Sequence, residues 1–272
     1  MQLDRYGVLE GKPDDTALDT MDEEVRLLGF TTLDAGLTET KLDQLSDLFD
    51  RAASTYRVRA AEQGLDLKSI AENDTIRLLP KEEPAFWEIV FNKNLHVLLN
   101  KLLGGYYILN QVNGLINRGN GSEYHQSKYH RDLPYQHFTS SRPLAINALF
   151  ALDPFTLENG ATRVIPASHH REAFPPGTLV SRNEKQVTVP RGTFIVLDCM
   201  VYHAGSSNRS KRDRRAINHV FTIPLIRQQL HLPSTLGEEV EFTESQRRTL
   251  GYGLEEYRSV DEWLASRAGM AS

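Results

Sequence analysis

The sequence predicts a mainly β fold, an antiparallel barrel or sandwich supported by flanking helices. Helical apolar spacing dominates residues 1–104, and short β-rich runs separated by turn residues occupy residues 105–225. Helical patterns return in the tail, residues 226–272. No helix-length pattern alternates with the short runs, so a parallel sheet built from βαβ units is not expected. Several short strands after a helical start are typical of an antiparallel barrel. We interpret the three segments as parts of a single domain, residues 1–272.

The first third of the chain contains three helical segments. Apolar residues between Leu18 and Leu28 recur at three-to-four spacing, and Gly29 is expected to end that helix. A second apolar stripe begins after Thr38, which is placed to cap the helix start. Residues 84–103 predict one or two further buried helices.

Five β-rich runs follow, at Tyr106–Ile116, Ala145–Leu152, Ala161–Ile165, Phe194–Leu197 and Ala216–Ile223. Turn residues such as Glu158-Asn159-Gly160 separate them. Two helix starts are expected in the tail, near Thr243 and near Val260.

Composition narrows the class of protein. The 272 residues include 31 Lys and Arg and 36 Asp and Glu, a formal net charge of −5. Nucleic-acid-binding domains are usually clearly basic, so we expect no nucleic-acid partner. No stretch approaches the roughly 18 apolar residues of a membrane span, and the N-terminus lacks a secretory pattern. The single cysteine, Cys199, excludes an internal disulfide. We therefore expect a cytoplasmic protein with no membrane partner; the sequence does not specify its oligomeric state.

His130 and Asp132 form a candidate metal-binding pair. Alternate residues of an extended segment face the same side, so the imidazole and the carboxylate converge. With one distant histidine they would form a facial triad of the kind that binds Fe(II). The alternative interpretation is a hydrogen-bonded pair on the surface. His-Arg-Asp-Leu also matches a kinase catalytic loop, but His137 stands where that loop needs asparagine.

Two further residues complete the candidate site. His203 follows the predicted strand Phe194–Leu197 by a few residues, and a histidine at a strand end can face the barrel interior. Arg214 lies eleven residues further on, and its planar guanidinium suits bidentate binding of a carboxylate. Taken alone, Arg214 is more readily interpreted as part of the solvated charge run 209–215. His169-His170 also looks like a metal pair, but we expect neighbouring strand residues to face opposite sides.

In this order, the motifs resemble the phytanoyl-CoA dioxygenase family of non-haem iron(II)- and 2-oxoglutarate-dependent oxygenases. The resemblance extends over residues 24–224. Residues 158–169, Glu-Asn-Gly-Ala-Thr-Arg-Val-Ile-Pro-Ala-Ser-His, are similar to the family signature "ENGA…viPGSH", with Ala167 where glycine is usual. The resemblance implies a double-stranded β-helix, a cupin-like jelly-roll barrel buttressed by N- and C-terminal helices.

The resemblance also implies roles for individual residues. His130, Asp132 and His203 would bind the iron, and Arg214 would pair with the distal carboxylate of 2-oxoglutarate. The catalytic set is then the same three ligands. Many relatives have serine two residues after the second histidine, where this chain has Gly205.

Other contacts in the site are expected from position alone. Asn113 and Asn117 lie at even spacing on the strand before the motif and are candidates to donate to 2-oxoglutarate. Gln136, His137 and Arg118 are candidates for the substrate opening.

The implied activity is oxidation of an unactivated C–H bond in a small-molecule substrate, a metabolite, with formation of succinate and CO₂. Fe(II), 2-oxoglutarate and O₂ would be required, with ascorbate as a reductant for the iron. Related halogenases have a small residue at the position of Asp132, so a carboxylate there favours hydroxylation. A non-catalytic ligand-binding jelly roll and a cupin-type isomerase or hydrolase are the alternatives. The intact ligand set together with Arg214 weighs against both, and the sequence does not identify the substrate.

Overall fold

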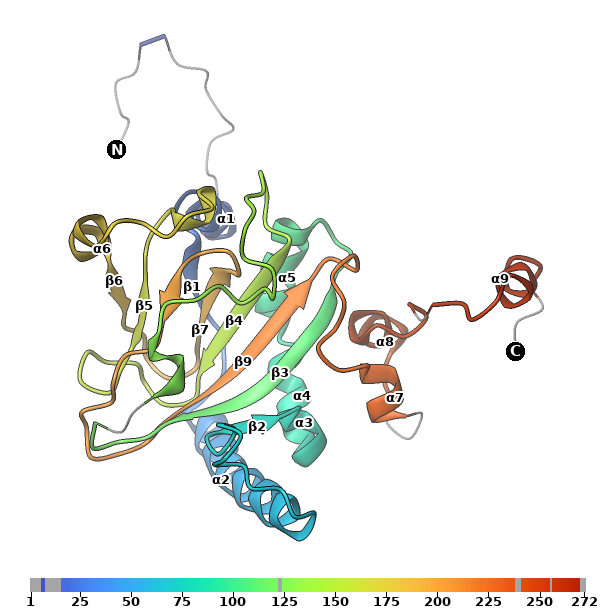
Figure 1. Cartoon of the computed structure of the whole chain (residues 1–272), viewed down its shortest axis with the longest axis horizontal. Coiled ribbons are helices and arrows are strands. Elements are labelled where there is room, and N and C mark those ends of the chain that lie inside the picture. The colour runs from blue at the N-terminus through green and yellow to red at the C-terminus, as the bar shows by residue number, and fades with distance from the viewer. Residues whose placement is uncertain (1–5, 8–15, 122–123, 238–240, 255, 270–272) are drawn as a thin grey trace.

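Two antiparallel sheets form the centre of the computed structural model, which describes residues 6–7, 16–121, 124–237, 241–254 and 256–269. Within these residues the larger sheet has the strand order β1-β7-β4-β9-β3-β2, and the smaller has the order β6-β5-β8. Leu149 and Ile195 of the larger sheet share one apolar cluster with Val164 of the smaller. The sheets therefore pack face to face, and the predicted jelly-roll fold with flanking helices is confirmed (Figure 1).

Each of the five predicted runs overlaps one observed strand, with ends that differ by no more than two residues. The larger sheet is built from β1 (Phe30–Asp34), β2 (Thr75–Arg77), β3 (Ile108–Asn117), β4 (Ala145–Ala151), β7 (Thr193–Asp198) and β9 (Arg214–Thr222). The smaller sheet is built from β5 (Thr162–Val164), β6 (Lys185–Val187) and β8 (His203–Ala204). β1, β2, β6 and β8 were not predicted. They have five residues or fewer, too short for a period of two to stand out.

The helices begin and end where capping residues allow. Thr38 accepts a hydrogen bond from the Lys41 N–H at 3.3 Å, and Gly29 ends its helix in the left-handed conformation at φ 87°. Thr243 opens its helix with a capping box. The helices are α1 (Ala17–Leu28), α2 (Glu39–Glu62), α3 (Leu79–Glu82), α4 (Trp87–Val90), α5 (Lys93–Leu103), α6 (Gly177–Asn183), α7 (Leu232–Leu236), α8 (Glu244–Leu250) and α9 (Val260–Arg267).

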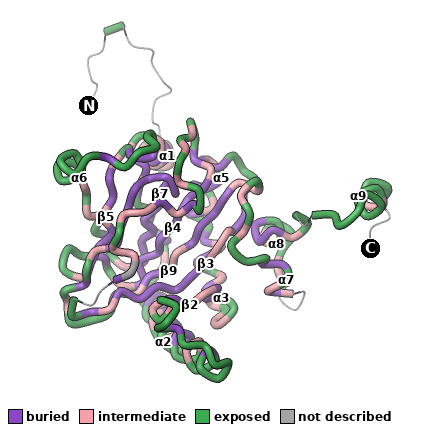
Figure 2. Tube along the Cα trace, in the orientation of Figure 1, coloured by how far each residue is buried: buried purple, intermediate pink, exposed green. Residues whose placement is uncertain are grey.

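The main core lies between the helices and the outer face of the larger sheet. Phe49 of α2 and Leu98 of α5 share an apolar cluster with Phe150 and Ile217 of the sheet. Gly114 lets α2 approach β3, because a Cβ there would lie 2.8 Å from the Phe49 ring. Figure 2 shows β3, β4, β7 and β9 largely buried, whereas α9 lies apart from the body and is largely exposed. In the described residues, no helix is both long and apolar enough to cross a bilayer.

Asp198, at the end of β7, carries a buried carboxyl group that is 5% exposed. One oxygen accepts a hydrogen bond from the Met200 N–H at 2.8 Å. Burial raises the pKa of Asp198 to about 6, and this hydrogen bond opposes the rise only in part. The unfolded chain ionises at lower pH than the folded protein, so the folded state loses stability as pH rises through this interval.

We predict that Asp198→Asn stabilises the protein at pH 8 by about 1–3 kcal/mol, because the amide keeps the acceptor without a buried charge. At pH 4, where the folded state already holds the proton, the gain should vanish. Urea unfolding at both pH values measures the difference. Exposed Asp66 accepts a similar bond from the Lys68 N–H at 3.0 Å, so Asp66→Asn is the control. Equal gains for both variants would contradict the prediction.

Candidate active site

His130 and His203 lie on two backbone segments that pair although 73 residues separate them. The His130 N–H donates to the His203 carbonyl oxygen at 3.0 Å, and the His203 N–H donates back at 3.1 Å. The Asp132 N–H donates to the carbonyl oxygen of Cys199, also at 3.0 Å. These bonds attach both ends of the His-Arg-Asp segment to the chain around β8.

Both imidazoles are oriented through Nδ1. This atom lies 2.8 Å from the Lys128 carbonyl oxygen in His130, and 3.1 Å from that of Val201 in His203. A carbonyl oxygen only accepts, so each Nδ1 carries the proton and each Nε2 is the nitrogen that can bind a metal. The Nε2 atoms of His130 and His203 lie 3.7 Å and 3.4 Å from Oδ1 of Asp132. The three ligand atoms all lie within 4.8 Å of one another.

Asn147 of β4 fixes the Asp132 carboxylate. Its Nδ2 donates to Oδ2 at 2.7 Å, so Oδ1 is the oxygen that faces the imidazoles. Burial acts to raise the pKa of Asp132, but His203, His130 and the Asn147 amide outweigh it and lower the pKa to about 2. Burial acts to lower the pKa of His203, and Asp132 raises it above its ordinary value. Two imidazole nitrogens and one charged carboxylate are the donor set that non-haem Fe(II) sites use.

Arg131 points to the opposite side of the segment from its two neighbours. It is 2% exposed, and its Nε donates to the Met200 carbonyl oxygen at 2.8 Å. Nη2 donates to the carbonyl oxygen of Ser168 at 3.1 Å, and the guanidinium lies 4.1 Å from the centre of the Tyr202 ring. Arg131 therefore connects the ligand segment to two loops behind it. No sequence pattern indicates this role, because a single arginine between two ligands has no spacing that distinguishes it.

Arg214, the first residue of β9, lies in the wall of the cavity beside the ligands. It is 3% exposed, and its guanidinium lies 3.9 Å from the centre of the Phe155 ring. Burial lowers the pKa of Arg214, while Tyr124 and Asp153 oppose that change. Among the described residues, Nε and Nη1 of Arg214 find no hydrogen-bond acceptor. A buried guanidinium with N–H groups left over is suited to bind an anion.

Arg215 faces the other side of the larger sheet. Its Nη2 lies 2.8 Å from Oδ1 of Asp153, and its Nη1 lies 3.0 Å from Oδ2 of Asp50 on α2. His219 has the same parity as Arg215, and its Nδ1 contacts the Ala148 carbonyl oxygen at 2.9 Å. The alternation expected from the sequence thus places Arg214, and neither Arg215 nor His219, beside the cavity.

Asn113 and Asn117 are both buried on β3. The Asn117 amide donates to the Ser206 carbonyl oxygen at 2.8 Å, and the Asn113 amide lies 3.1 Å from the Gln111 side chain. In the described part of the chain, neither belongs to the cavity wall. Their contact with 2-oxoglutarate stays a prediction.

Arg118 was a candidate for the substrate opening, but it lies on the outer side of the larger sheet, away from the cavity beside the ligands. Its Nε lies 2.6 Å from Asp74 and its Nη1 lies 2.7 Å from Asp213, in a groove that it shares with Arg215. The end of β3 carries it to the outer side of the sheet, and these carboxylates hold it there.

Tyr124 occupies space that exists because residue 205 is glycine. A Cβ on Gly205 would lie 2.4 Å from Cε1 of the Tyr124 ring. The Tyr124 hydroxyl donates to Oε1 of Gln126 at 3.1 Å and is hydrogen-bonded to the Arg214 side chain. Burial raises the pKa of Tyr124, so the hydroxyl stays neutral. No sequence pattern points to Tyr124, because it lies far from Gly205 in the chain.

His169 and His170 lie in a 3₁₀ turn, Ser168–His170, and not in a strand. The expectation that they face opposite sides was therefore wrong. Their ring centres lie 3.9 Å apart, and both Nε2 atoms lie 3.0 Å from the Arg26 carbonyl oxygen at the end of α1. The pair attaches this turn to α1.

The family model described as "Phytanoyl-CoA dioxygenase (PhyH)" matches residues 25–216. The chain belongs to the phytanoyl-CoA dioxygenase family. The family expected from the sequence is therefore confirmed, and with it the assignment of the protein as a non-haem iron- and 2-oxoglutarate-dependent dioxygenase.

Three relatives of this phytanoyl-CoA dioxygenase family protein show how far the similarity extends. The uncharacterized protein Rv1501 of Mycobacterium tuberculosis is 28% identical over 254 residues, 91% of this chain and 92% of that protein. The iron/alpha-ketoglutarate-dependent dioxygenase ausO of Aspergillus calidoustus is 29% identical over 148 residues, 51% of this chain and 49% of its own. The structure of EctD from S. alaskensis with 2-oxoglutarate and 5-hydroxyectoine has a TM-score of 0.65 at 18% identity, covering 89% of this chain and 90% of that one.

We predict that His203→Ala weakens Fe(II) binding by more than about 100-fold, because loss of an outer hydrogen-bond partner of a ligand already costs about 10–100-fold. Asn147→Ala removes such a partner and should fall within that range. Anaerobic calorimetric titration of Fe(II) into the metal-free proteins measures both. His137→Ala, an exposed histidine in the next loop, should bind as the unmodified protein does. Wild-type affinity in His203→Ala would show that the ligand set is wrong.

Proposed function

We propose that the protein hydroxylates an unactivated C–H bond of a small metabolite. The balanced reaction converts R–H, 2-oxoglutarate and O₂ into R–OH, succinate and CO₂. One observation carries the proposal: a single cavity contains both the three convergent ligand atoms and the buried guanidinium of Arg214. Two nitrogens of that guanidinium have no hydrogen-bond acceptor in the described residues. A ligand-binding barrel without chemistry would need only one of these two features.

His130, Asp132 and His203 would hold the iron. Their Nδ1 bonds and the Asn147 amide orient the donor atoms before the metal arrives, so little reorganisation accompanies binding. The bound iron supplies the oxidising chemistry with 2-oxoglutarate and O₂, while the cavity walls orient the substrate and exclude water. Related halogenases have a small side chain at the position of Asp132. The carboxylate of Asp132 therefore favours hydroxylation.

Arg214 would pair with the distal carboxylate of 2-oxoglutarate, and the Tyr124 hydroxyl would supply a second contact. Relatives with serine two residues after the second histidine offer a hydroxyl from that position. Here Gly205 makes room for the Tyr124 ring, and the tyrosine hydroxyl lies against the same arginine. We infer that Tyr124 replaces the missing serine hydroxyl.

The substrate is proposed to be a small molecule, with no nucleic acid or membrane partner. We also propose the cytoplasm as location, since a lone cysteine, the buried Cys199, suits a reducing compartment.

Succinate formation tests the reaction directly. Protein supplied with Fe(II), ascorbate and 2-oxoglutarate under nitrogen should form succinate and CO₂ only after O₂ is admitted, slowly without substrate and faster with it. Asp132→Ala should lose this turnover by at least about 100-fold, because a charged ligand is lost and a coordination position opens. Turnover of Asp132→Ala within a few-fold of the unmodified protein would exclude Asp132 as a ligand. No succinate under any condition would favour the ligand-binding alternative.

The cosubstrate anchor is tested by titrating 2-oxoglutarate anaerobically into the iron-loaded protein and following its charge-transfer absorption. We expect Arg214→Ala to weaken 2-oxoglutarate by about 30-fold or more, since a buried carboxylate that loses its partner typically costs about 2–5 kcal/mol. Tyr124→Phe removes one hydroxyl and should cost about three- to tenfold.

Arg215→Ala is the matched control for the anchor. It breaks the ion pairs with Asp153 and Asp50, so it should lower the unfolding midpoint while changing 2-oxoglutarate affinity by less than about threefold. Iron affinity should stay nearly unchanged in all three variants. The reverse order of effects, with Arg215 more important than Arg214, would move the anchor to the other face of the sheet.

A further inference from the structure

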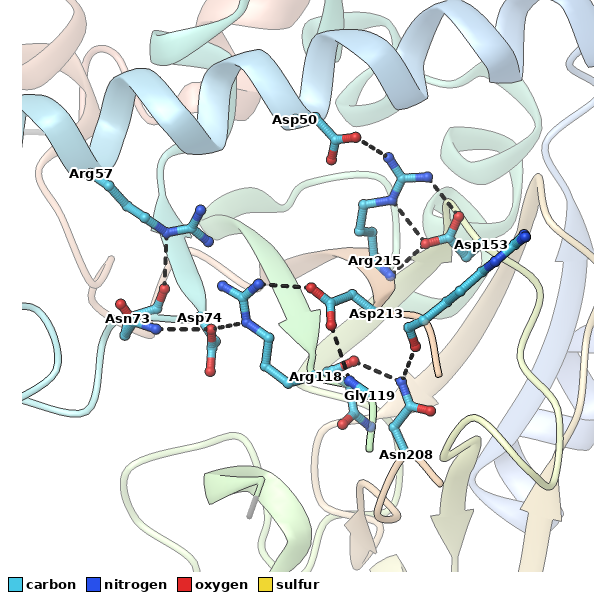
Figure 3. Close-up of polar contacts among 12 residues, drawn as sticks. Asp50, Arg57, Asn73, Asp74, Arg118, Gly119, Asp153, Asn208, Asp213 and Arg215 are labelled. Atoms are coloured by element: carbon cyan, nitrogen blue, oxygen red, sulfur yellow. Dashed lines mark hydrogen bonds and ion pairs between the residues drawn. The ribbon is translucent and has the colours of Figure 1, made fainter. Parts of the chain in front are cut away.

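The inner face of β9 carries an unmatched polar side chain besides Arg214. Side chains alternate along the strand, so Arg214 and Asn218 share the face that lines the cavity. On the outer face, by contrast, Arg215 is held between Asp50 and Asp153 (Figure 3). Oδ1 of Asn218 is buried and finds no hydrogen-bond donor among the described residues. The inner face therefore offers a polar group that the fold itself does not use.

Asn147 of β4 lies beside Asn218 in the larger sheet. In the register of β4 and β9, Asn147 is opposite Val220, so Asn147 and Asn218 are diagonal neighbours on the same face. Diagonal residues of an antiparallel pair lie about 7–8 Å apart, close enough for one small group to contact both side chains. Asn147 is 3% exposed, and it also lines the cavity. We call Asn147 and Asn218 the amide pair.

The amide pair presents two hydrogen-bond acceptors. Nδ2 of Asn147 donates to Oδ2 of Asp132, and a carboxylate only accepts, so the remaining atom of that amide is its oxygen. Oδ1 of Asn147 is likewise buried without a donor in the described residues. No donor fixes Oδ1 of Asn218, so this amide can turn toward a ligand. A buried acceptor without a partner is unfavourable, and both oxygens are stabilised when an O–H or N–H group arrives.

The charges around the amide pair favour an uncharged ligand. Apart from the two imidazoles, the described cavity wall has one acidic and one basic side chain, Asp132 and Arg214. Oδ2 of Asp132 is bonded to Asn147 and Oδ1 faces the imidazoles, so neither oxygen is left for a substrate ammonium group. Leu149 and Leu197 lie opposite the members of the amide pair in the sheet and also line the cavity. A neutral polar group on an apolar carbon frame matches this wall.

The amide pair lies close to the metal ligands and away from the cosubstrate anchor. Asn147 is hydrogen-bonded directly to Asp132. Arg214 precedes Asn218 by four residues, about 13 Å along the strand at about 3.3 Å per residue. The proposed contact for 2-oxoglutarate and the amide pair therefore occupy different parts of one cavity, and their effects on binding can be measured separately.

We propose that the amide pair selects the substrate by binding an uncharged hydroxyl or amide N–H group beside the C–H bond that is oxidised. The substrate class is then a neutral molecule with a hydrogen-bond donor close to the reacting carbon. This inference rests on the proposed function, because it uses the same cavity and metal. Asn218 is the member to test, since Asn147 also holds Asp132 and its replacement would disturb a ligand.

Proton relaxation of two matched probes tests the requirement for a donor. Cyclohexanol has an O–H group, whereas cyclohexanone has the same carbon ring and can only accept. The protein is loaded with 2-oxoglutarate and with Mn(II) in place of Fe(II), because Mn(II) relaxes nearby protons strongly and does not start the oxidation. The excess relaxation of the ring protons over that in Mg(II)-loaded protein should be about three- to tenfold larger for cyclohexanol, the range expected for one additional hydrogen bond.

Two substitutions of Asn218 separate the effects of polarity and charge. Asn218→Leu keeps a similar volume without polar atoms, so it should abolish the preference for cyclohexanol while 2-oxoglutarate affinity, measured by calorimetry, stays within about twofold. Asn218→Asp keeps the shape and adds a charge, so it should raise the relaxation of cyclohexylammonium at least about threefold over the unmodified protein. Asn94→Leu is the control, because Asn94 is exposed on α5 and outside the described cavity wall. It should keep the preference for cyclohexanol.

The outcomes distinguish this inference from the proposed function. Equal relaxation of the two ring probes by Mn(II)-loaded protein would overturn the inference and leave the proposed function standing. A preference for cyclohexanol that persists in Asn218→Leu would do the same. A larger loss of 2-oxoglutarate affinity in Asn218→Leu would assign Asn218 to the cosubstrate and also overturn it. Failure of the unmodified protein to bind Mn(II) would contradict the ligand set, and the proposed function and this inference would then fall together.

Discussion

Side-chain alternation along extended chain is the constraint on which the rest of this structure depends. In His130-Arg131-Asp132 it sends two ligands to one side and a buried arginine to the other, where Arg131 holds the loops behind the site. At the start of β9 it sends Arg214 into the cavity and Arg215 onto α2. Because the period is two, a shift of register by one residue would exchange every such pair. The same alternation builds the site and the scaffold.

The second requirement is the long-range pairing that brings the ligands together. His130 and His203 exchange two backbone hydrogen bonds, and β8 is itself held beside β5. The imidazoles are then aimed by carbonyl oxygens two residues upstream in each case, Lys128 and Val201. Local backbone thus sets the orientation of each ring, while the sheet sets the distance between them. Asn147, from a third strand, completes the geometry by selecting which oxygen of Asp132 faces the rings.

The sequence was informative where a feature is local or periodic. Helix ends at Thr38, Gly29 and Thr243 follow from capping chemistry, and the inward direction of Arg214 follows from parity with Ala216. Features that depend on tertiary contact were missed. The strands β1 and β2 are recognisable only by their partners, and Tyr124 acquires its position only because Gly205 lies beside it in space. Asn147 likewise looks like an ordinary strand residue until Asp132 is placed next to it.

Arg214 also shows why a binding site opposes stability in the free protein. A guanidinium that is 3% exposed has lost its hydration, and it is compensated in part by the Phe155 ring, the Tyr124 hydroxyl and the charge of Asp153. Leaving a charged group partly unpaired in a buried setting is unfavourable. The unfavourable term disappears when a carboxylate enters and accepts from the unmatched N–H groups. Folding therefore pays part of the cost of cosubstrate binding in advance, because it already removes Arg214 from water. The same strand alternation directs its neighbour Arg215 to the other face of the sheet, where Arg215 forms ion pairs.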